Sequence, residues 1–238
     1  MKTERTHDKF YLDENRYNQP KEMFKFIANK AFSEESRDSN FKIADFGCAA
    51  GEFLFYLNQI LPNASLIGID ILPELLDKCS RFVPAAKLKE GSILDGDIQP
   101  ENYFDKTFLI GVHSIFDEFE TCLNNLVKFT KIGGAAYVVG MFNPFPVDVI
   151  IKYKESKNIN KDIFESGWNI FSQESVSRFL VNHQKVKSFS FIPFEINMSL
   201  VRQQDVIRSW TIQCSKGKHL ITNGLCIIQP IFLLEIQL

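Results

Sequence analysis

The fold of this chain is decided by the stretch Ile43-Ala44-Asp45-Phe46-Gly47-Cys48-Ala49-Ala50-Gly51-Glu52-Phe53-Leu54. Its apolar start predicts a strand, and the spaced glycines predict a turn that opens directly into an amphipathic helix over 52–61. Such a strand–turn–helix gathers free backbone N–H groups and the positive end of the helix at one point. A Cβ at Gly47 or Gly51 would block the turn or keep a ligand from the backbone. The stretch therefore predicts a ligand site at the start of this helix.

A second apolar run, Leu66-Ile67-Gly68-Ile69, ends in Asp70, nineteen residues after Gly51. An acidic residue at this distance, at the end of the next strand, suits a bidentate contact to ribose hydroxyls. The turn reads G-C-A-A-G and so lacks the middle glycine of the dinucleotide fingerprint. Asp45 adds a carboxylate, which favours a cationic ligand over a pyrophosphate. These signals indicate a nucleoside-bearing cofactor; the alternative is a tight turn without a ligand.

The segment Asp45-Phe46-Gly47-Cys48-Ala49-Ala50-Gly51 resembles the D-x-G-C-x-x-G motif of class I S-adenosylmethionine-dependent methyltransferases. Asp70 stands where that family has its ribose-binding acid, and the resemblance covers about residues 40–145. It implies S-adenosyl-L-methionine as the cofactor. The cofactor-binding residues that it implies, in the motif and at the ends of the neighbouring strands, are Asp45, Gly47, Cys48, Gly51, Asp70, Ile71, Ser92, Ile93 and Val112.

The adenine contact departs from the family pattern. In that family the end of the third strand often carries an acidic side chain that meets the adenine amino group. Here Ser92 stands at that position, and Asp95 follows three residues later. The alternative for this segment is an ordinary strand-ending turn at Asp95-Gly96-Asp97.

Strand-like and helix-like runs alternate from residue 41 to 142, which predicts a parallel, doubly wound sheet. We expect an α/β fold with a mostly parallel, seven-stranded, Rossmann-like sheet, an antiparallel last strand, an N-terminal cap helix and an added C-terminal hairpin. We expect one domain with a cap segment (1–40), a cofactor-binding half (41–145) and a substrate-side half (146–238). The expected strands are 43–46, 66–70, 87–93, 104–113, 135–141, 185–196, 209–214, 219–222 and 226–238. The expected helices are 20–32, 52–61, 74–82 and 116–129, one within 147–171, and one capped by Ser172.

Composition limits the classes of partner. The 238 residues are 45% hydrophobic with a formal net charge of −2, which disfavours a dedicated nucleic-acid binder. Five widely spaced cysteines without a C-x-x-C pair argue against a disulfide framework or a zinc site and for a reducing compartment. The scattered histidines lack metal-ligand spacing, so we expect metal-independent chemistry. No apolar leader or membrane-length run occurs, and a cytoplasmic protein without membrane contact is expected.

His113 is the candidate catalytic base. It falls at the expected end of the fourth strand, beside the point where the sheet order reverses and ligands gather. Its ordinary pKa suits removal of a hydroxyl proton, and its replacement is expected to lower turnover while sparing cofactor affinity. The alternative is a histidine that only packs or hydrogen-bonds. Candidate substrate contacts are Tyr17, Asp117, Arg208 and Trp210, for each of which a purely structural role is the alternative.

The resemblance implies methyl transfer from the sulfonium of S-adenosylmethionine, and we expect a small polar metabolite or sugar-type acceptor methylated at oxygen. Three alternatives stay open: methylation of nitrogen on a small molecule or protein side chain, a methyltransferase-like binding protein without activity, and a nicotinamide-dependent oxidoreductase. Asn143-Pro144-Phe145 is similar to a motif of enzymes that methylate bases, but it follows the fifth expected strand instead of the fourth. We therefore interpret it as a loop.

Overall fold

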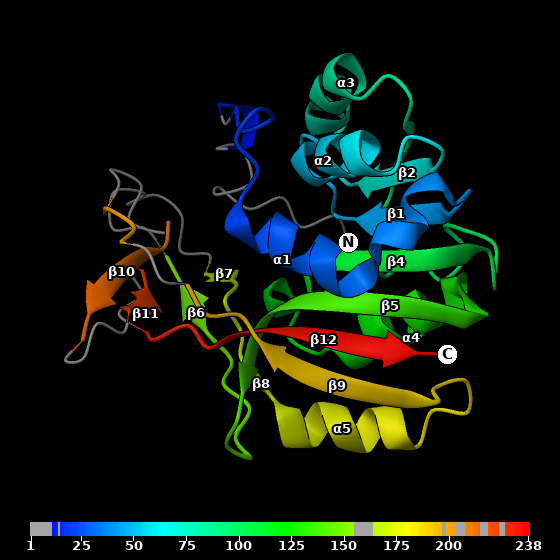
Figure 1. Ribbon diagram of the computed structural model, residues 1–238. Coiled ribbons are helices and arrows are strands. Elements are labelled where there is room, and N and C mark those ends of the chain that lie inside the picture. Colours follow the sequence, from blue (N-terminus) through cyan, green and yellow to red (C-terminus); the bar gives the residue numbers. More distant parts are fainter. Residues whose placement is uncertain are drawn as a thin grey trace.

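The structure is a computed structural model that describes residues 11–13, 15–154, 164–196, 199–202, 208–214, 219–223 and 227–238. Its centre is an eight-stranded sheet in which seven strands follow the order β3-β2-β1-β4-β5-β12-β9 and β8 pairs with the end of β5 (Figure 1). The strands are β1 Lys42–Phe46, β2 Ser65–Asp70, β3 Lys87–Glu90, β4 Phe104–Ile110, β5 Thr130–Asn143, β8 Phe171–Ser172, β9 Ser188–Pro193 and β12 Ile231–Gln237. β12 runs antiparallel to both of its neighbours, and the strands from β3 to β5 are parallel. The predicted doubly wound sheet with an antiparallel last strand is confirmed.

Helices cover both faces of the sheet (Figure 1). One apolar cluster joins the face that carries α1 Glu22–Ala31, α2 Glu52–Ile60 and α3 Pro73–Phe82. The other cluster joins α4 Glu120–Phe129 and α5 Gln173–Val181 to the opposite face. Apolar residues at helical spacing cause this arrangement, because they place one continuous stripe against the sheet. The predicted cap of α5 is present, with Ser172 Oγ accepting a hydrogen bond from the Ser175 N–H at 3.0 Å.

The segment before α5 differs from the expectation. Instead of a helix within 147–171, the described part holds a short antiparallel pair, β6 Lys152–Tyr153 with β7 Glu165–Ser166, and an antiparallel bridge between Val149 and Ile170. β-branched residues occupy positions 147 and 149–151 and favour extended backbone over helix. Residues 155–163 of the expected helix lie outside the described residues.

Two boundaries near the predicted site also differ. β4 ends at Ile110 because Gly111 turns the chain at a φ of 72°, so His113 lies in a short 3-10 helix, η3 His113–Ile115, and α4 begins four residues later than expected. β5 begins at Thr130, and the expected Gly133-Gly134 turn is part of the strand. A Cβ on Gly134 would lie 2.7 Å from the Asp105 carbonyl, so glycine lets the two strands approach closely there.

The C-terminal addition is a separate two-stranded sheet, β10 Trp210–Gln213 with β11 His219–Thr222, paired antiparallel as expected. The predicted turn at Lys216-Gly217 lies outside the described residues. Both small sheets, β6–β7 and β10–β11, lie beyond the edge of the central sheet where β5 ends and β12 begins (Figure 1). A further 3-10 helix, η2 Glu34–Asp38, connects α1 to β1. No helix among the described ranges is long and apolar enough to cross a bilayer.

Candidate active site

The turn between β1 and α2 is built on positive φ angles. Gly47 has a φ of 78°, Gly51 has 79°, and Ala49 is held at 47° between them. The N–H groups of Gly47 and Cys48 both donate to the Ile69 carbonyl, at 2.7 and 3.0 Å, which ties the turn to the end of β2. A Cβ on Gly47 would lie 2.4 Å from Val112 Cγ2. Packing as well as backbone conformation therefore requires glycine here.

Asp70 closes the same turn from the end of β2. Its Oδ2 accepts the Ala49 N–H at 2.8 Å, and its Oδ1 accepts the Leu72 N–H at 3.0 Å. These charge-assisted bonds fix the carboxylate at the carboxyl edge of the sheet, next to the point where the strand order reverses between β1 and β4. Asp70 lines the large cavity at this edge, as its predicted role in ribose binding requires.

Asp45 has a different environment. Its side chain is 2% exposed, and Oδ1 has no hydrogen-bond partner within the described part of the chain. Burial, together with repulsion from Asp70, raises the pKa of this carboxyl to about 8. A buried carboxylate without a partner is costly unless a cation or a donor joins it. Asp45 also lines the cavity, so its oxygen fits the cationic part of a sulfonium cofactor.

The cavity has a volume of about 1240 Å³ and lies over the carboxyl ends of β1, β2, β4 and β5. Its wall brings together eight of the nine predicted cofactor residues, namely Asp45, Gly47, Cys48, Asp70, Ile71, Ser92, Ile93 and Val112. Gly51 is not part of the wall. It is the residue before α2, where a Cβ would lie 2.2 Å from Cys79 Sγ. The predicted residues thus share one cavity, and Gly51 acts on its shape through helix packing.

Ser92 and Ile93 follow β3 in a tight turn. Asp95 Oδ2 accepts the Ser92 N–H at 3.2 Å, Ser92 Oγ accepts the Leu94 N–H at 3.1 Å, and the Ile93 carbonyl accepts from Asn125 Nδ2 at 2.8 Å. Asp95 therefore works as a turn-forming residue, which was the alternative interpretation of this segment. The turn still presents Ser92 and Ile93 to the cavity.

His113 lies under the cavity floor instead of on it. Its side chain is 1% exposed, and its ring stacks on the Phe142 ring with 4.6 Å between the two ring centroids. The imidazole occupies the space that a Cβ on residue 140 would fill, which Gly140 leaves open. Nε2 is 3.4 Å from the Met141 carbonyl and 3.4 Å from Ser114 Oγ, while Nδ1 has no partner among the described residues. Burial lowers the pKa of the imidazole to about 4, so the ring is neutral at pH 7. Ser114, not His113, lines the cavity.

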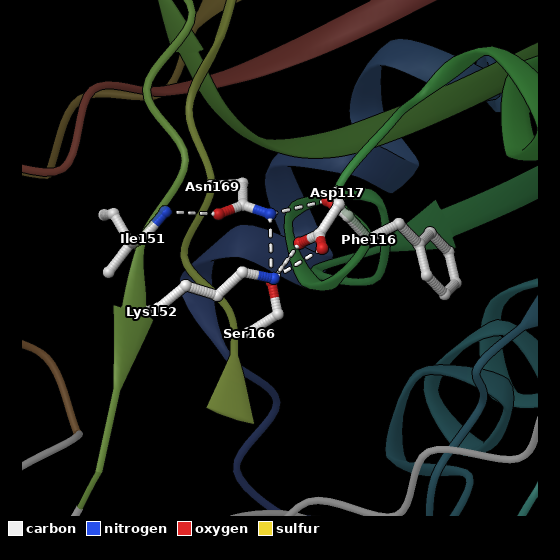
Figure 2. A network of polar contacts seen from close by, with 6 residues as sticks. All are labelled: Phe116, Asp117, Ile151, Lys152, Ser166 and Asn169. Atoms are coloured by element: carbon white, nitrogen blue, oxygen red, sulfur yellow. Dashed lines mark hydrogen bonds and ion pairs between the residues drawn. The ribbon is translucent and has the colours of Figure 1, made fainter. Parts of the chain in front are cut away.

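The predicted substrate residue Asp117 lines the cavity as part of a polar network (Figure 2). Its carboxylate accepts from Lys152 Nζ at 2.6 Å and from Ser166 Oγ, and these contacts lower its pKa. Asn169, which is fully buried, donates to the Phe116 carbonyl at 2.6 Å and accepts the N–H of residue 151 at 2.7 Å. The network ties the β6–β7 pair to the loop after η3 (Figure 2).

The other three predicted substrate residues take different places. Arg208 lines the cavity, and its guanidinium lies 5.4 Å from the Tyr11 ring centre. Trp210 is outside the wall and has Arg202 over its ring at 5.1 Å. Tyr17 is also outside the wall. Its ring is 3% exposed, stacks on Phe82 at 3.9 Å and donates its hydroxyl to the Ala50 carbonyl at 2.7 Å. Tyr17 thereby fastens the N-terminal segment to the glycine turn.

A second half of the cavity was not found from the sequence. Its wall combines residues from α1, the end of β5, the segment after β9, β11, and the start of β12 with the segment before it, namely Met23, Phe24, Met141, Phe194, Ile196, Leu200, Ile221, Gln229 and Ile231. The sequence marks Met23 and Phe24 as one apolar helix face, which predicts burial but not a ligand. Gln229, which lies between apolar residues at the entry to a buried strand, was the one local signal of a polar function.

Comparison with known proteins supports the assignment of the cofactor half. A family described as Methyltransferase domain matches residues 43–134. No curated protein matches the sequence significantly. YcgJ of Bacillus subtilis is similar in structure, with 13% identity and a TM-score of 0.56 over 90% of this chain and 97% of that chain.

Two further solved structures share the fold. One, from work on the conversion of a disulfide bond into a thioacetal group during echinomycin biosynthesis, has 12% identity and a TM-score of 0.55 over 97% of this chain and 91% of that chain. The geranyl diphosphate C-methyltransferase of Streptomyces coelicolor, in complex with Mg²⁺, geranyl-S-thiolodiphosphate and S-adenosyl-L-homocysteine, has 15% identity and a TM-score of 0.51 over 72% of this chain and 58% of that chain. The match to the methyltransferase domain, residues 43–134, contains the carboxyl ends of β1, β2 and β4, which wall the cofactor half of the cavity, and the similar solved structures share the fold.

Proposed function

We propose that this chain is an S-adenosylmethionine-dependent methyltransferase that acts on a small-molecule acceptor and transfers the methyl group to oxygen. One observation carries the proposal: the cavity that holds Asp45 and Asp70 is also lined by the apolar half around Phe194 and Ile231. Its volume of about 1240 Å³ exceeds the roughly 300–1,000 Å³ of ordinary ligand sites. It therefore has room for an acceptor beside the cofactor.

The residues of this chain contribute mainly by positioning. S-adenosylmethionine, when bound, supplies an electrophilic methyl group on a sulfonium. Asp45 and Asp70 would hold the cofactor through charge and hydrogen bonds, and Val112 packs against Gly47 at the switch point of the sheet. The apolar half would bind the acceptor beside the cofactor and exclude water from it.

Oxygen is favoured over nitrogen because the acidic side chains on the acceptor side already have partners. Asp117 accepts from Lys152, Glu118 accepts the Thr121 N–H at 3.0 Å, and Glu165 accepts the Tyr153 hydroxyl at 3.1 Å. An ammonium acceptor would need such a carboxylate to offset its desolvation. A neutral hydroxyl does not carry this cost.

The role of His113 as a base remains a proposal, and Ser114 provides its route to the cavity. Ser114 Oγ lines the wall at 3.4 Å from His113 Nε2, so a hydroxyl proton would reach the imidazole through this serine. A pKa of about 4 makes the ring a weak base, so we expect positioning to supply more of the acceleration than proton transfer.

The test is formation of S-adenosylhomocysteine with acceptor pairs that differ in one atom type. 2-Naphthol with 2-naphthylamine and glucose with glucosamine give a large apolar pair and a polar sugar pair. We expect an O-methyl product, identified by mass spectrometry, from 2-naphthol or from glucose. Turnover of the amine members alone would contradict methylation at oxygen.

A further inference from the structure

Gln229 is a buried amide that is held in one orientation. Its side chain is 5% exposed, and its Oε1 accepts a hydrogen bond from Ser209 Oγ at 2.7 Å. Its backbone N–H donates to the Ile221 carbonyl at 2.8 Å, which fixes the position of the residue beside β11. Nε2 has no partner within the described ranges, although Gln229 lines the cavity. The amide therefore keeps two N–H donors without an acceptor.

The wall around this amide is apolar. Ile231 begins β12 opposite Met141 at the end of β5, and the Phe194 N–H donates to the Ile231 carbonyl at 2.9 Å. These three side chains line the cavity together with Leu200 and Ile221. A largely apolar wall with a few convergent polar groups, here Gln229 with Ser209 and Arg208, is the usual construction of a site that orients a small molecule.

We propose that Gln229 recognises a carbonyl-type oxygen on an acceptor whose remaining surface is largely apolar. The inference rests on the proposed function and adds the substrate class to it. Ser209 occupies Oε1 of the amide, so the side chain presents donors and selects a hydrogen-bond acceptor on the ligand. In an apolar wall, a ligand that lacks this oxygen leaves the amide unsatisfied, which disfavours its binding.

A carboxylate is the competing class of ligand group, because Arg208 lines the same cavity. A guanidinium prefers a carboxylate or phosphate, whereas a neutral amide N–H suits a ketone, an ester or an amide oxygen equally well. The two residues therefore predict different rank orders for the same apolar body carrying different oxygen groups.

The experiment measures binding of three probes, 2-acetylnaphthalene, 2-ethylnaphthalene and 2-naphthoate, by quenching of tryptophan fluorescence in the full chain. The wild type is compared with Gln229→Leu, and Gln213→Leu is the matched control at an exposed position of β10. The preference is the ratio of the affinities for the ketone and the hydrocarbon. We expect this ratio to fall about three- to tenfold in Gln229→Leu, because one neutral hydrogen bond contributes a factor of this size, and to stay unchanged in Gln213→Leu. Ser209→Ala, which releases the amide without removing it, is expected to lower the preference by a smaller factor.

An unchanged preference in Gln229→Leu, or failure of both neutral probes to bind, would overturn the proposal. Tighter binding of 2-naphthoate than of the ketone would overturn it in favour of recognition by Arg208.

Calorimetric titration of the wild type and each variant with S-adenosylmethionine distinguishes a failure of this inference from a failure of the proposed function. If the wild type binds S-adenosylmethionine but neither neutral probe, only this inference is refuted. If the wild type does not bind S-adenosylmethionine, the proposed function itself is refuted. Circular dichroism establishes that each variant is folded, and Gln229→Glu, which exchanges donors for acceptors, replaces Gln229→Leu if that variant does not fold.

Discussion

At the scale of single residues, the two carboxylates of the proposed cofactor site have different environments. Asp70 accepts backbone N–H groups on both oxygens, so it shapes the turn as well as facing the cavity. Asp45 has one buried oxygen without a described partner, and with a pKa of about 8 the carboxyl is largely protonated near neutral pH, so a bound cation would favour its ionisation. We propose that Asp70 both shapes the turn and binds the cofactor, whereas Asp45 serves the cationic part of the ligand.

The pKa of Asp45 predicts a pH dependence of cofactor binding. Burial raises it to about 8, with Asp70 adding repulsion and the Cys48 thiol as the other titratable neighbour. Since this lies above the unfolded value of about 3.9, the free energy of unfolding falls as the pH rises from about 4 to about 8. A cationic ligand favours the ionised form. We therefore expect the affinity for S-adenosylmethionine to rise between about pH 6 and pH 8, by up to about tenfold per unit.

Calorimetric titration with S-adenosylmethionine over this pH range checks the prediction. Asp45→Asn is the control, because protonation of the ligand's own groups affects both proteins equally. The variant should lose the part of the pH dependence that belongs to Asp45. Identical pH profiles for the two proteins would show that Asp45 does not titrate on binding.

His113 predicts a dependence of the opposite sign. Burial lowers the pKa of its imidazole to about 4, below the unfolded value of about 6.5, so the unfolded chain binds more protons between these values. The stability is therefore fully present above about pH 6.5 and is lost as the pH falls. From pH 7 to pH 5 we expect a loss of about 1–2 kcal/mol that His113→Asn abolishes. Urea unfolding of both proteins at the two pH values measures the difference, and an equal loss in the variant would contradict it.

Alanine substitutions at Gly51 and Gly133 distinguish the cost of a steric contact from the cost of the positive φ angle. Alanine there combines a positive φ with a Cβ 2.2 Å from Cys79 Sγ, whereas Gly133 has a φ of 82° and nothing within 4 Å of an added Cβ. We expect Gly133→Ala to cost about 1 kcal/mol and Gly51→Ala about 3 kcal/mol or more. Thermal unfolding monitored by circular dichroism compares them. Equal costs would mean that the contact with Cys79 relaxes freely.

At the scale of elements, the β6–β7 pair is held to the loop after η3 by a network with unequal members (Figure 2). The ion pair of Lys152 with Asp117 is exposed, with side chains 44% and 57% accessible. Asn169 is fully buried and connects the Phe116 carbonyl to the N–H of residue 151. Exposed ion pairs contribute little, whereas a lost buried amide leaves its partners unsatisfied.

We therefore expect Asn169→Ala to destabilise the protein by about 2–3 kcal/mol and Lys152→Met by less than about 1 kcal/mol. Urea unfolding gives the two values, and hydrogen exchange of the N–H of residue 151 shows whether the loss is local. A larger effect from Lys152→Met would assign the attachment of β6–β7 to the ion pair instead.

At the scale of the whole molecule, the sequence predicted the cofactor half far better than the acceptor half. The Asp45–Gly51 turn and Asp70 are local signals, since spacing along one strand–turn–helix unit places them together. The acceptor half gathers Phe24, Met141, Phe194 and Gln229 from four distant segments, and local patterns report their burial without their meeting.

The misplaced features have local physical causes. The pattern over 104–113 predicts a continuous strand with His113 at the cavity, but Gly111 has a positive φ, the strand ends before it, and the imidazole lies against Gly140. The described part of 147–171 holds no helix, because β-branched residues at 147 and 149–151 favour extended backbone, with Val149 bridged to Ile170 and β6 paired with β7. In both places one residue type decided the backbone path against a longer pattern.

The central claim is that the cavity binds a sulfonium cofactor between Asp45 and Asp70, and calorimetric titration with S-adenosylmethionine and with NAD in parallel tests it most directly. We expect S-adenosylmethionine to bind at one site, NAD to give no signal, and Asp70→Asn to weaken the cofactor by about 1.5–3 kcal/mol through the loss of charge-assisted hydrogen bonds. Binding of NAD alone, or full affinity in a folded Asp70→Asn variant, would contradict the account.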